Sequence, residues 1–252
     1  MSADTSVIDK LRALLAQVRL ELVGGGEAIV WEGRTTPVPG RLPLDDLDPH
    51  AEAGELMAVA AAIEAAVKVP AKLVPGEDFR TGAAALLPKL ERRRFVDAYD
   101  AVRPGADERL LWRDFGGGLA VCYVEDQGWR FQYMARGRFE GWDTTLETVH
   151  SGARSNLYHR AAIDWQAREV ALGDGYDAGR AVILDDVFYD RHGPDGIAFA
   201  VPSRDLLLVG SKERPLVPAQ VRSAYESARY PIAPDVFAFA GHRATVVRGL
   251  LT

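Results

Sequence analysis

Two pairs of oppositely charged residues in the C-terminal half of the chain are the side chains best suited to binding chemistry. Asp177 and Arg180 lie three residues apart in a predicted short helix, and Arg204 and Asp205 occupy a predicted turn. Each of the two could form an ion pair. One interpretation is that one recess for an anion or a peptide is lined by Tyr176, Asp177, Arg180, Arg204 and Asp205. The alternative is that they are turn and cap residues that hold the helix to a hairpin.

A catalytic use of the same acids requires a partner base. Asp177 or Asp205 with a histidine such as His150 or His159 would suit a small-molecule hydrolase or transferase. However, the five histidines show no spacing typical of zinc hydrolases, and no serine lies in a nucleophile-elbow pattern. The single cysteine, Cys122, lies in an apolar strand and is typical of a buried filler. A non-catalytic function is therefore favoured, and neither a metal nor a cofactor is predicted.

A glycine pattern invites a nucleotide-binding interpretation. Gly173-Asp174-Gly175 with Gly179 is close to a dinucleotide-binding fingerprint, which requires a parallel βαβ unit. Here the pattern follows predicted antiparallel strands, so we interpret it as a glycine turn before a helix. Asp114-Phe115-Gly116 matches a kinase motif, but the other kinase segments are absent from the sequence, and we interpret it as a hairpin turn.

Two motifs carry a resemblance to a known family. They are Gly175-Tyr176-Asp177-Ala178-Gly179-Arg180 and Ile197-Ala198-Phe199-Ala200-Val201-Pro202-Ser203-Arg204-Asp205. The helix entered at Trp142-Asp143-Thr144, with Asn156-Leu157 near its end, adds a similar order of elements. Over residues 142–211 the chain resembles a bacterial family called domain of unknown function 1444. The resemblance implies a cytoplasmic bacterial protein of unassigned role, and it transfers no catalytic residue.

The composition limits the classes of partner. With 48% hydrophobic and 26% charged residues, the 252-residue chain is typical of folded soluble proteins. Its longest apolar run, residues 56–63, is too short to cross a bilayer, and Met1-Ser2-Ala3-Asp4-Thr5 lacks the basic start of a secretory signal. With one cysteine, this predicts a cytoplasmic protein. The net charge of −6 argues against nucleic acid, and Arg92-Arg93-Arg94 is interpreted as a solvated face.

Hydrophobic periodicity predicts the N-terminal elements. An amphipathic helix is expected from Val7 to Leu22, before Gly24-Gly25-Gly26. A strand over 28–32, a proline-rich loop over 35–49 and an alanine-rich helix over 51–68 follow.

The C-terminal part is predicted to alternate strands with short helices. An antiparallel meander is expected first, over 110–115, 119–125 and 129–134. A helix capped by Thr144, with Glu147 completing the capping box, should end near Arg160. The remaining expected elements are a strand over 162–172, a short helix over 176–184, a hairpin of 197–201 with 206–209 buried on both faces, a helix beginning at Pro218, and strands over 236–240 and 244–247.

These elements predict an α+β protein with a mainly antiparallel sheet packed against several helices. A change of pattern near residue 80 separates an N-terminal helical segment with a short strand, residues 1–80, from an α+β core, residues 81–252, although one domain is also compatible. The favoured function is a non-catalytic module that binds another protein or a small acidic ligand. Neither nucleic acid nor a membrane is expected as a partner, and the oligomeric state stays open, a homodimer included.

Overall fold

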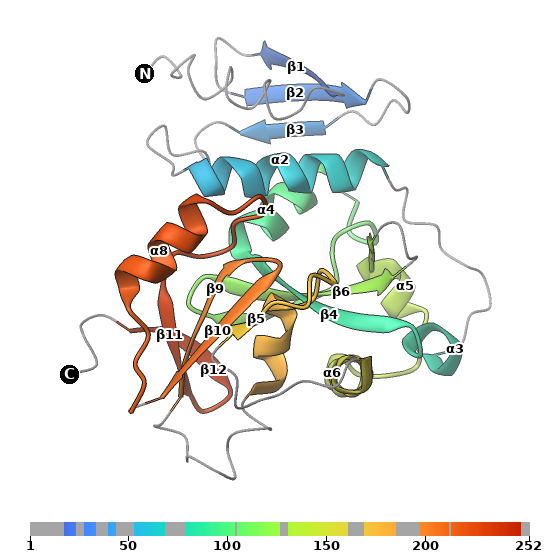
Figure 1. Cartoon of the computed structure of the whole chain (residues 1–252). Helices are drawn as coiled ribbons and strands as arrows, with labels where there is room; N and C mark the ends of the chain where they lie inside the picture. Colours follow the sequence, from blue (N-terminus) through green and yellow to red (C-terminus); the bar gives the residue numbers. More distant parts are fainter. Residues whose placement is uncertain are drawn as a thin grey trace.

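The computed structural model describes residues 18–23, 28–33, 40–43, 53–68, 79–103, 105–126, 131–160, 169–184, 197–211 and 213–247. These residues form three antiparallel sheets and several helices (Figure 1). The predicted α+β class is therefore confirmed. No helix within the described ranges is both long and apolar enough to cross a membrane.

The central sheet has the order β4-β6-β5, and β7 pairs with the distal half of β6. Its strands are β4 (Leu86–Arg92), β5 (Trp112–Gly116), β6 (Leu119–Asp126) and β7 (Phe131–Tyr133). Strand β6 is buried from Leu119 to Val124 because both of its faces are covered. The predicted meander of β5, β6 and β7 is confirmed.

A second sheet faces the central one. Its order is β12-β11-β9-β10-β8, with the strands β8 (Glu169–Val170), β9 (Ile197–Ser203), β10 (Leu206–Ser211), β11 (Val236–Ala240) and β12 (Arg243–Val246). The predicted hairpin is confirmed, and β9 is buried on both faces as expected. Burial on both faces is wrong for β10, in which Leu206 and Leu208 are half-buried. Phe199 stacks on Phe237 at 5.4 Å between ring centres, within a core that contains Val121 and Tyr123 of the central sheet.

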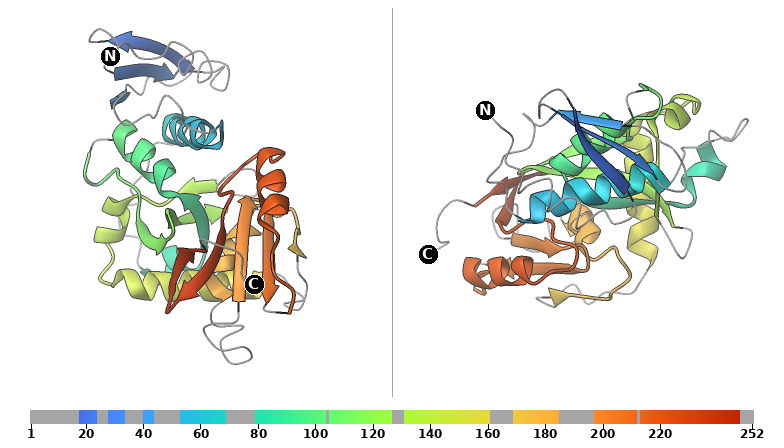
Figure 2. Two further views of the ribbon diagram at one scale, coloured as in Figure 1. Left: turned by 90° about the vertical axis from the view of Figure 1, so that its left-hand side faces the viewer. Right: turned by 90° about the horizontal axis from the view of Figure 1, so that it is seen from above.

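Helices cover the outer faces of both sheets (Figure 2). On the central sheet, α2 (Ala53–Lys68) and α4 (Arg93–Val102) pack in one hydrophobic cluster with Ala120 and Cys122. On the second sheet, α8 (Pro218–Glu226) places Val221 against Ala198 and Ala200, whose small side chains allow a close approach. The predicted α2 and the predicted start at Pro218 are confirmed.

The remaining helices support the edge of the central sheet. They are α3 (Phe79–Ala83), α5 (Arg136–Glu140), α6 (Leu146–Arg160) and the 3-10 helix η3 (Ala178–Ile183). The predicted end of α6 is confirmed, but its cap is Thr145, whose Oγ1 accepts from the Thr148 amide at 3.2 Å. The predicted cap was thus one residue too early, because both threonines suit the N-cap position although only Thr144 has a glutamate three residues on.

The third sheet lies on the far side of α2 from the central sheet (Figure 1). Its strands are β1 (Val18–Val23), β2 (Ala28–Gly33) and β3 (Gly40–Pro43), in that order. The predicted strand over 28–32 is confirmed. The helix expected to run to Leu22 is wrong over 18–22, because Val18-Arg19-Leu20-Glu21-Leu22 also alternates with period two and pairs with β2 in register. Residues 7–17 of that prediction lie outside the described residues.

Three further expectations need correction. The loop expected over 35–49 contains β3, and its other residues lie outside the described ranges. Of the strand expected over 162–172, only Glu169–Val170 forms, at the edge of the second sheet, while 162–168 lie outside the described residues. The short helix predicted over 176–184 is the 3-10 helix η3.

Two elements were not predicted from the sequence. They are β4 and α4, which meet at Arg92 and Arg93. The division near residue 80 stays a prediction, and the cluster that α2 shares with α4 favours the one-domain alternative.

Candidate functional site

Both predicted charge pairs form, but in different environments. Arg180 Nη1 donates to Asp177 Oδ1 at 2.9 Å, and both side chains are 0% exposed. Arg180 also binds Asp174 through two hydrogen bonds, at 2.9 and 2.6 Å. Burial raises the pKa of Asp177. Burial would also raise the pKa of Asp174, but hydrogen bonds from Arg180 and the Tyr176 amide bring it below its ordinary value.

The buried pair joins η3 to its neighbours. The Ala178 amide donates to the Arg204 carbonyl at 3.1 Å, which connects η3 to the hairpin turn. Tyr176 is fully buried and packs edge-on against Phe131 at 5.0 Å. The structure therefore places Tyr176, Asp177 and Arg180 in the interior, as the turn-and-cap alternative requires. A binding role for these three residues stays a prediction.

The glycine pattern before η3 forms a turn. Gly173 and Gly175 have φ values of +69° and +81°, which side chains with a Cβ rarely adopt. A Cβ at Gly175 would lie 2.7 Å from the Phe131 ring. Strand β8, which precedes the turn, pairs antiparallel with β10. The interpretation as a glycine turn is thus confirmed over the dinucleotide fingerprint, which needs a parallel βαβ unit.

Among the predicted site residues, Arg204 lines a pocket. At the β9–β10 turn its guanidinium binds both oxygens of Asp205, at 3.0 and 3.2 Å. Its carbon atom Cζ lies 3.8 Å from the centre of the Tyr230 ring, and its amide donates to the Tyr230 carbonyl at 2.9 Å. Burial would lower the pKa of Arg204, but the hydrogen bonds and charge of Asp205 raise it above its ordinary value. Arg204 is therefore a fixed and permanent cation.

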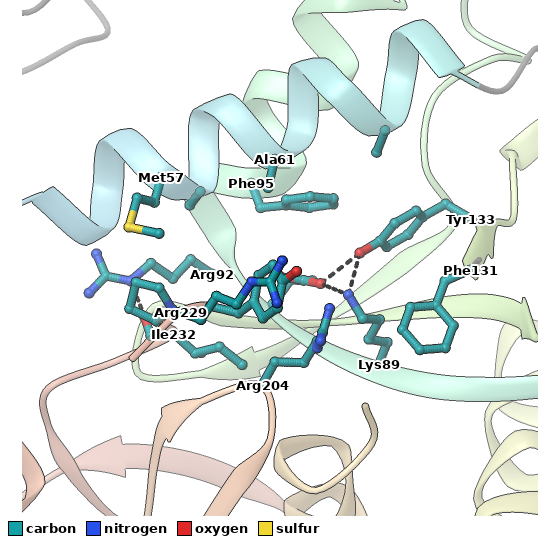
Figure 3. Close-up of a pocket in the computed structure, with 15 residues that line it drawn as sticks. Met57, Ala61, Lys89, Arg92, Phe95, Phe131, Tyr133, Arg204, Arg229 and Ile232 are labelled. Carbon is teal, nitrogen blue, oxygen red and sulfur yellow. Dashed lines mark hydrogen bonds and ion pairs between the residues drawn. The ribbon is translucent and has the colours of Figure 1, made fainter. Parts of the chain in front are cut away.

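Arg204 lines a pocket of about 320 Å³, hereafter the α2–β4 pocket (Figure 3). It lies where α2 passes over β4 and over the segments that follow β9 and α8. Its lining residues are Met57, Ala58, Ala61, Ala65, Lys89, Glu91, Arg92, Phe95, Phe131, Tyr133, Arg204, Arg229, Tyr230, Pro231 and Ile232. Its volume is at the lower end of the range for small-molecule sites. Tyr176, Asp177, Arg180 and Asp205 do not line it.

Three polar side chains form a closed network on the floor of the pocket. Lys89 Nζ donates to Glu91 Oε1 at 2.5 Å and to the Tyr133 hydroxyl at 2.7 Å. The Tyr133 hydroxyl donates to the same Glu91 oxygen at 2.6 Å (Figure 3). Burial, followed by the negative charge of Glu91, raises the pKa of Tyr133 well above its ordinary value. Tyr133 therefore remains protonated and keeps its role as a donor.

Positive charge predominates in the pocket. Among the described lining residues, Arg92, Arg204, Arg229 and Lys89 are cations and Glu91 is the one acid. Arg92 is held in place by the Ile232 carbonyl and by the Tyr225 hydroxyl at 3.0 Å. Arg229 is exposed, lies 5.1 Å from the Tyr230 ring centre, and forms no ion pair with another described residue.

The walls of the pocket are apolar. Met57, Ala61 and Phe95 form the side toward α2, and Phe131 closes the end beside Lys89 (Figure 3). The small alanines of α2 leave the space that larger side chains would fill. An apolar wall with a few fixed polar groups is typical of small-ligand sites.

A second cavity lies at the start of α4. It has a volume of about 430 Å³ and includes Arg92, Arg94, Arg222 and Asp235. Although it is larger, its Arg222 is exposed and its Arg94 is half-buried, whereas the cations Lys89 and Arg204 of the α2–β4 pocket are each held by hydrogen bonds to an acid. We therefore regard the α2–β4 pocket as the better-built site.

The residues considered for catalysis lie apart from this pocket. His150 is buried, its Nδ1 lies 3.1 Å from the Tyr123 hydroxyl, and burial, followed by the charges of Arg113 and Arg154, lowers its pKa to about 3. His159 lies at the end of α6 beside Tyr158. Cys122 is buried in β6, as predicted. Among the described residues, no group of three or more His, Cys, Asp and Glu side chains could hold a metal ion.

Four residues of the pocket were not predicted from the sequence: Lys89, Glu91, Tyr133 and Tyr230. A pattern that could have indicated two of them was present, because Lys89 and Glu91 alternate with leucines in Leu86-Leu87-Pro88-Lys89-Leu90-Glu91. Two charges on one face of an otherwise apolar strand must find partners, as these do.

The predicted solvated face of Arg92-Arg93-Arg94 is not uniform. Arg92 is hydrogen-bonded inside, Arg93 stacks on Trp112 at 4.0 Å, and Arg94 lines the second cavity.

Comparisons of the chain with models of known families, with curated proteins and with solved structures find no match. The resemblance to domain of unknown function 1444 therefore stays a prediction. Any function assigned to the pocket depends on its geometry and charge.

Proposed function

We propose that this protein binds a small organic anion in the α2–β4 pocket. The observation that carries the proposal is the fixed guanidinium of Arg204, which is oriented by Asp205 and Tyr230 at the edge of a half-open pocket whose described lining is predominantly cationic. An arginine held before the ligand arrives loses little conformational freedom on binding.

The charge of the lining supports an anion over a neutral or cationic ligand. Three of the four cations are arginines, which match the planar oxygens of carboxylates and phosphates. Because the protein as a whole carries a net charge of −6, this local excess of positive charge is distinct from the general surface. It also agrees with the small acidic ligand expected from the sequence.

The chemistry of the lining supports binding over catalysis. The described lining residues include no serine, cysteine, histidine or aspartate. Lys89 and Tyr133 are both hydrogen-bonded to Glu91, and the raised pKa of Tyr133 keeps its hydroxyl protonated, so it is not available as a base.

Isothermal titration calorimetry of the full chain at low salt tests the proposal. The titrants are glycerol 3-phosphate and gluconate, two small organic anions with different charged groups. We expect saturable binding of at least one, weakened roughly tenfold or more by Arg204→Gln, which removes a charged donor.

Two control variants make the result specific. Arg243→Gln removes the same charge from an exposed position on β12 and should leave the affinity unchanged. Arg94→Gln removes a cation from the second cavity. Two results would contradict the assignment of this pocket. One is that neither anion binds, and the other is that Arg94→Gln lowers the affinity while Arg204→Gln does not.

A further inference from the structure

Glu91 has one oxygen engaged and one open. Its Oε1 accepts from both Lys89 Nζ and the Tyr133 hydroxyl, which fixes the plane of the carboxylate. Its Oε2 forms no hydrogen bond or ion pair with any other described residue, although the side chain is only 14% exposed and lines the pocket. The buried side-chain atoms without a partner among the described residues do not include this oxygen, so it stays open to the pocket. A carboxylate oxygen is a strong acceptor, and a donor on the ligand can bind it in place of solvent.

The surroundings of Glu91 favour a hydroxyl over an ammonium group as this donor. Lys89 already neutralises Glu91 at 2.5 Å. A ligand ammonium would also be repelled by Arg92, Arg204 and Arg229. A neutral hydroxyl can donate to Oε2 without this repulsion.

The balance of charge favours a phosphate ester as the anionic part. Among the described lining residues four cations stand against the carboxylate of Glu91, and Asp205 pairs with Arg204 from outside the lining, so these six residues together carry two positive charges more than negative ones. A phosphate monoester carries about −1.5 to −2 at neutral pH, compared with −1 for a carboxylate. A volume of about 320 Å³ accommodates a phosphate with a short polyol chain.

We infer that the ligand is a phosphorylated polyol, such as a small sugar phosphate, whose phosphate binds Arg204 and whose hydroxyl donates to Oε2 of Glu91. This inference rests on the proposed function, since it names the class of anion that the same pocket binds. Glu91 is then the residue that determines specificity, and Lys89 and Tyr133 are positioning residues that orient it.

The test compares two phosphate esters of similar size by calorimetry. Glycerol 3-phosphate carries two hydroxyls, and n-propyl phosphate carries none. We expect the protein to prefer glycerol 3-phosphate by about tenfold, the effect of one hydrogen bond to a charged acceptor. Glu91→Gln should reduce this preference to about twofold or less, because Lys89 and Tyr133 hold the amide oxygen and leave an NH₂ group facing the ligand.

A second variant guards against a folding defect. Tyr133→Phe keeps the charge of Glu91 but removes one of the donors that orient it, so the preference should fall partly while n-propyl phosphate binds as before. Folding of both variants is checked by circular dichroism.

The outcomes separate this inference from the proposed function. Equal affinity for both esters, still lost with Arg204→Gln, would overturn the role of Glu91 and leave anion binding intact. Tighter binding of gluconate than of glycerol 3-phosphate would overturn the phosphate class alone. Absence of binding to all three anions would overturn both proposals.

Discussion

The guanidinium of Arg204 lies over the Tyr230 ring, and its Cζ is 3.8 Å from the ring centre. The two residues come from different elements, the β9–β10 turn and the segment after α8, and a backbone hydrogen bond of 2.9 Å joins them. One edge of the guanidinium is taken by Asp205. Stacking and pairing together restrict the arginine to one orientation toward the α2–β4 pocket.

Replacement of Tyr230 should therefore weaken anion binding without removing any charge. Tyr230→Leu removes the ring, and an interaction of about 0.5–1 kcal/mol corresponds to a two- to fivefold loss of affinity for glycerol 3-phosphate. Tyr230→Phe keeps the ring and should bind almost as the wild type does. Calorimetry of the two variants checks this, and an equal loss in both would assign the effect to the hydroxyl instead of the stacking.

The buried pair of Asp177 and Arg180 is expected to serve stability. Arg180→Met leaves two carboxylates, Asp174 and Asp177, without their buried cation, and breaking such a pair costs about 3–5 kcal/mol. Urea unfolding followed by circular dichroism measures this loss. Where the variant is folded, its affinity for glycerol 3-phosphate should be unchanged, because Arg180 does not line the pocket. A folded Arg180→Met protein of normal stability that no longer binds anions would restore the recess first considered from the sequence.

Two glycines provide a matched pair of alanine substitutions. A Cβ at Gly179 would lie 2.8 Å from the Pro88 carbonyl oxygen, so Gly179→Ala must push η3 away from β4 and should lower the free energy of unfolding by about 1–3 kcal/mol. Gly152, on α6, has nothing within 4 Å of the same position. Gly152→Ala should raise the free energy of unfolding by about 0.5–1 kcal/mol, since alanine favours the helix. Thermal denaturation measures the stability of both variants. If Gly179→Ala were as stable as Gly152→Ala, the packing of η3 on β4 would be contradicted.

His150 makes the fold sensitive to acid. Its pKa is lowered from 6.5 to about 3, so the unfolded chain takes up a proton at a higher pH than the folded protein does. Its contribution is neutral above pH 6.5, becomes destabilising as the pH falls below that value, and stops growing near pH 3. The slope is at most about 1.4 kcal/mol per pH unit. His150→Gln removes the titrating group and should flatten the difference in unfolding free energy between pH 6.5 and 4.5, as measured by urea titration at each pH. Parallel curves for the variant and the wild type would contradict this assignment.

The parts of the fold that could be predicted are those with a strong local signal. The apolar hairpin of β9 and β10, the alanine-rich α2 and the proline start of α8 follow from periodicity and helix-start rules. The strand β1 could not be separated from a helix, because its apolar residues fit both periods and pairing with β2 decides between them. Helix α4 was missed because Arg92-Arg93-Arg94 conceals the change from strand to helix.

The candidate site was predicted only at Arg204. Lys89 and Tyr133 are 44 residues apart in the chain, and their contact depends on the pairing of β6 with both β4 and β7. No short-range spacing in the sequence predicts such a contact. Both charge pairs form, but they differ in burial. Asp177 and Arg180 are inside the core, whereas Arg204 lines the pocket.

The most direct measurement is a crystal structure of the protein with ribose 5-phosphate, a larger member of the proposed ligand class, at a concentration that saturates binding in solution. We expect the phosphate in the α2–β4 pocket within hydrogen-bond distance of Arg204, with a sugar hydroxyl on Oε2 of Glu91. A phosphate bound instead beside Arg94 and Arg222, or an empty α2–β4 pocket under these conditions, would contradict it.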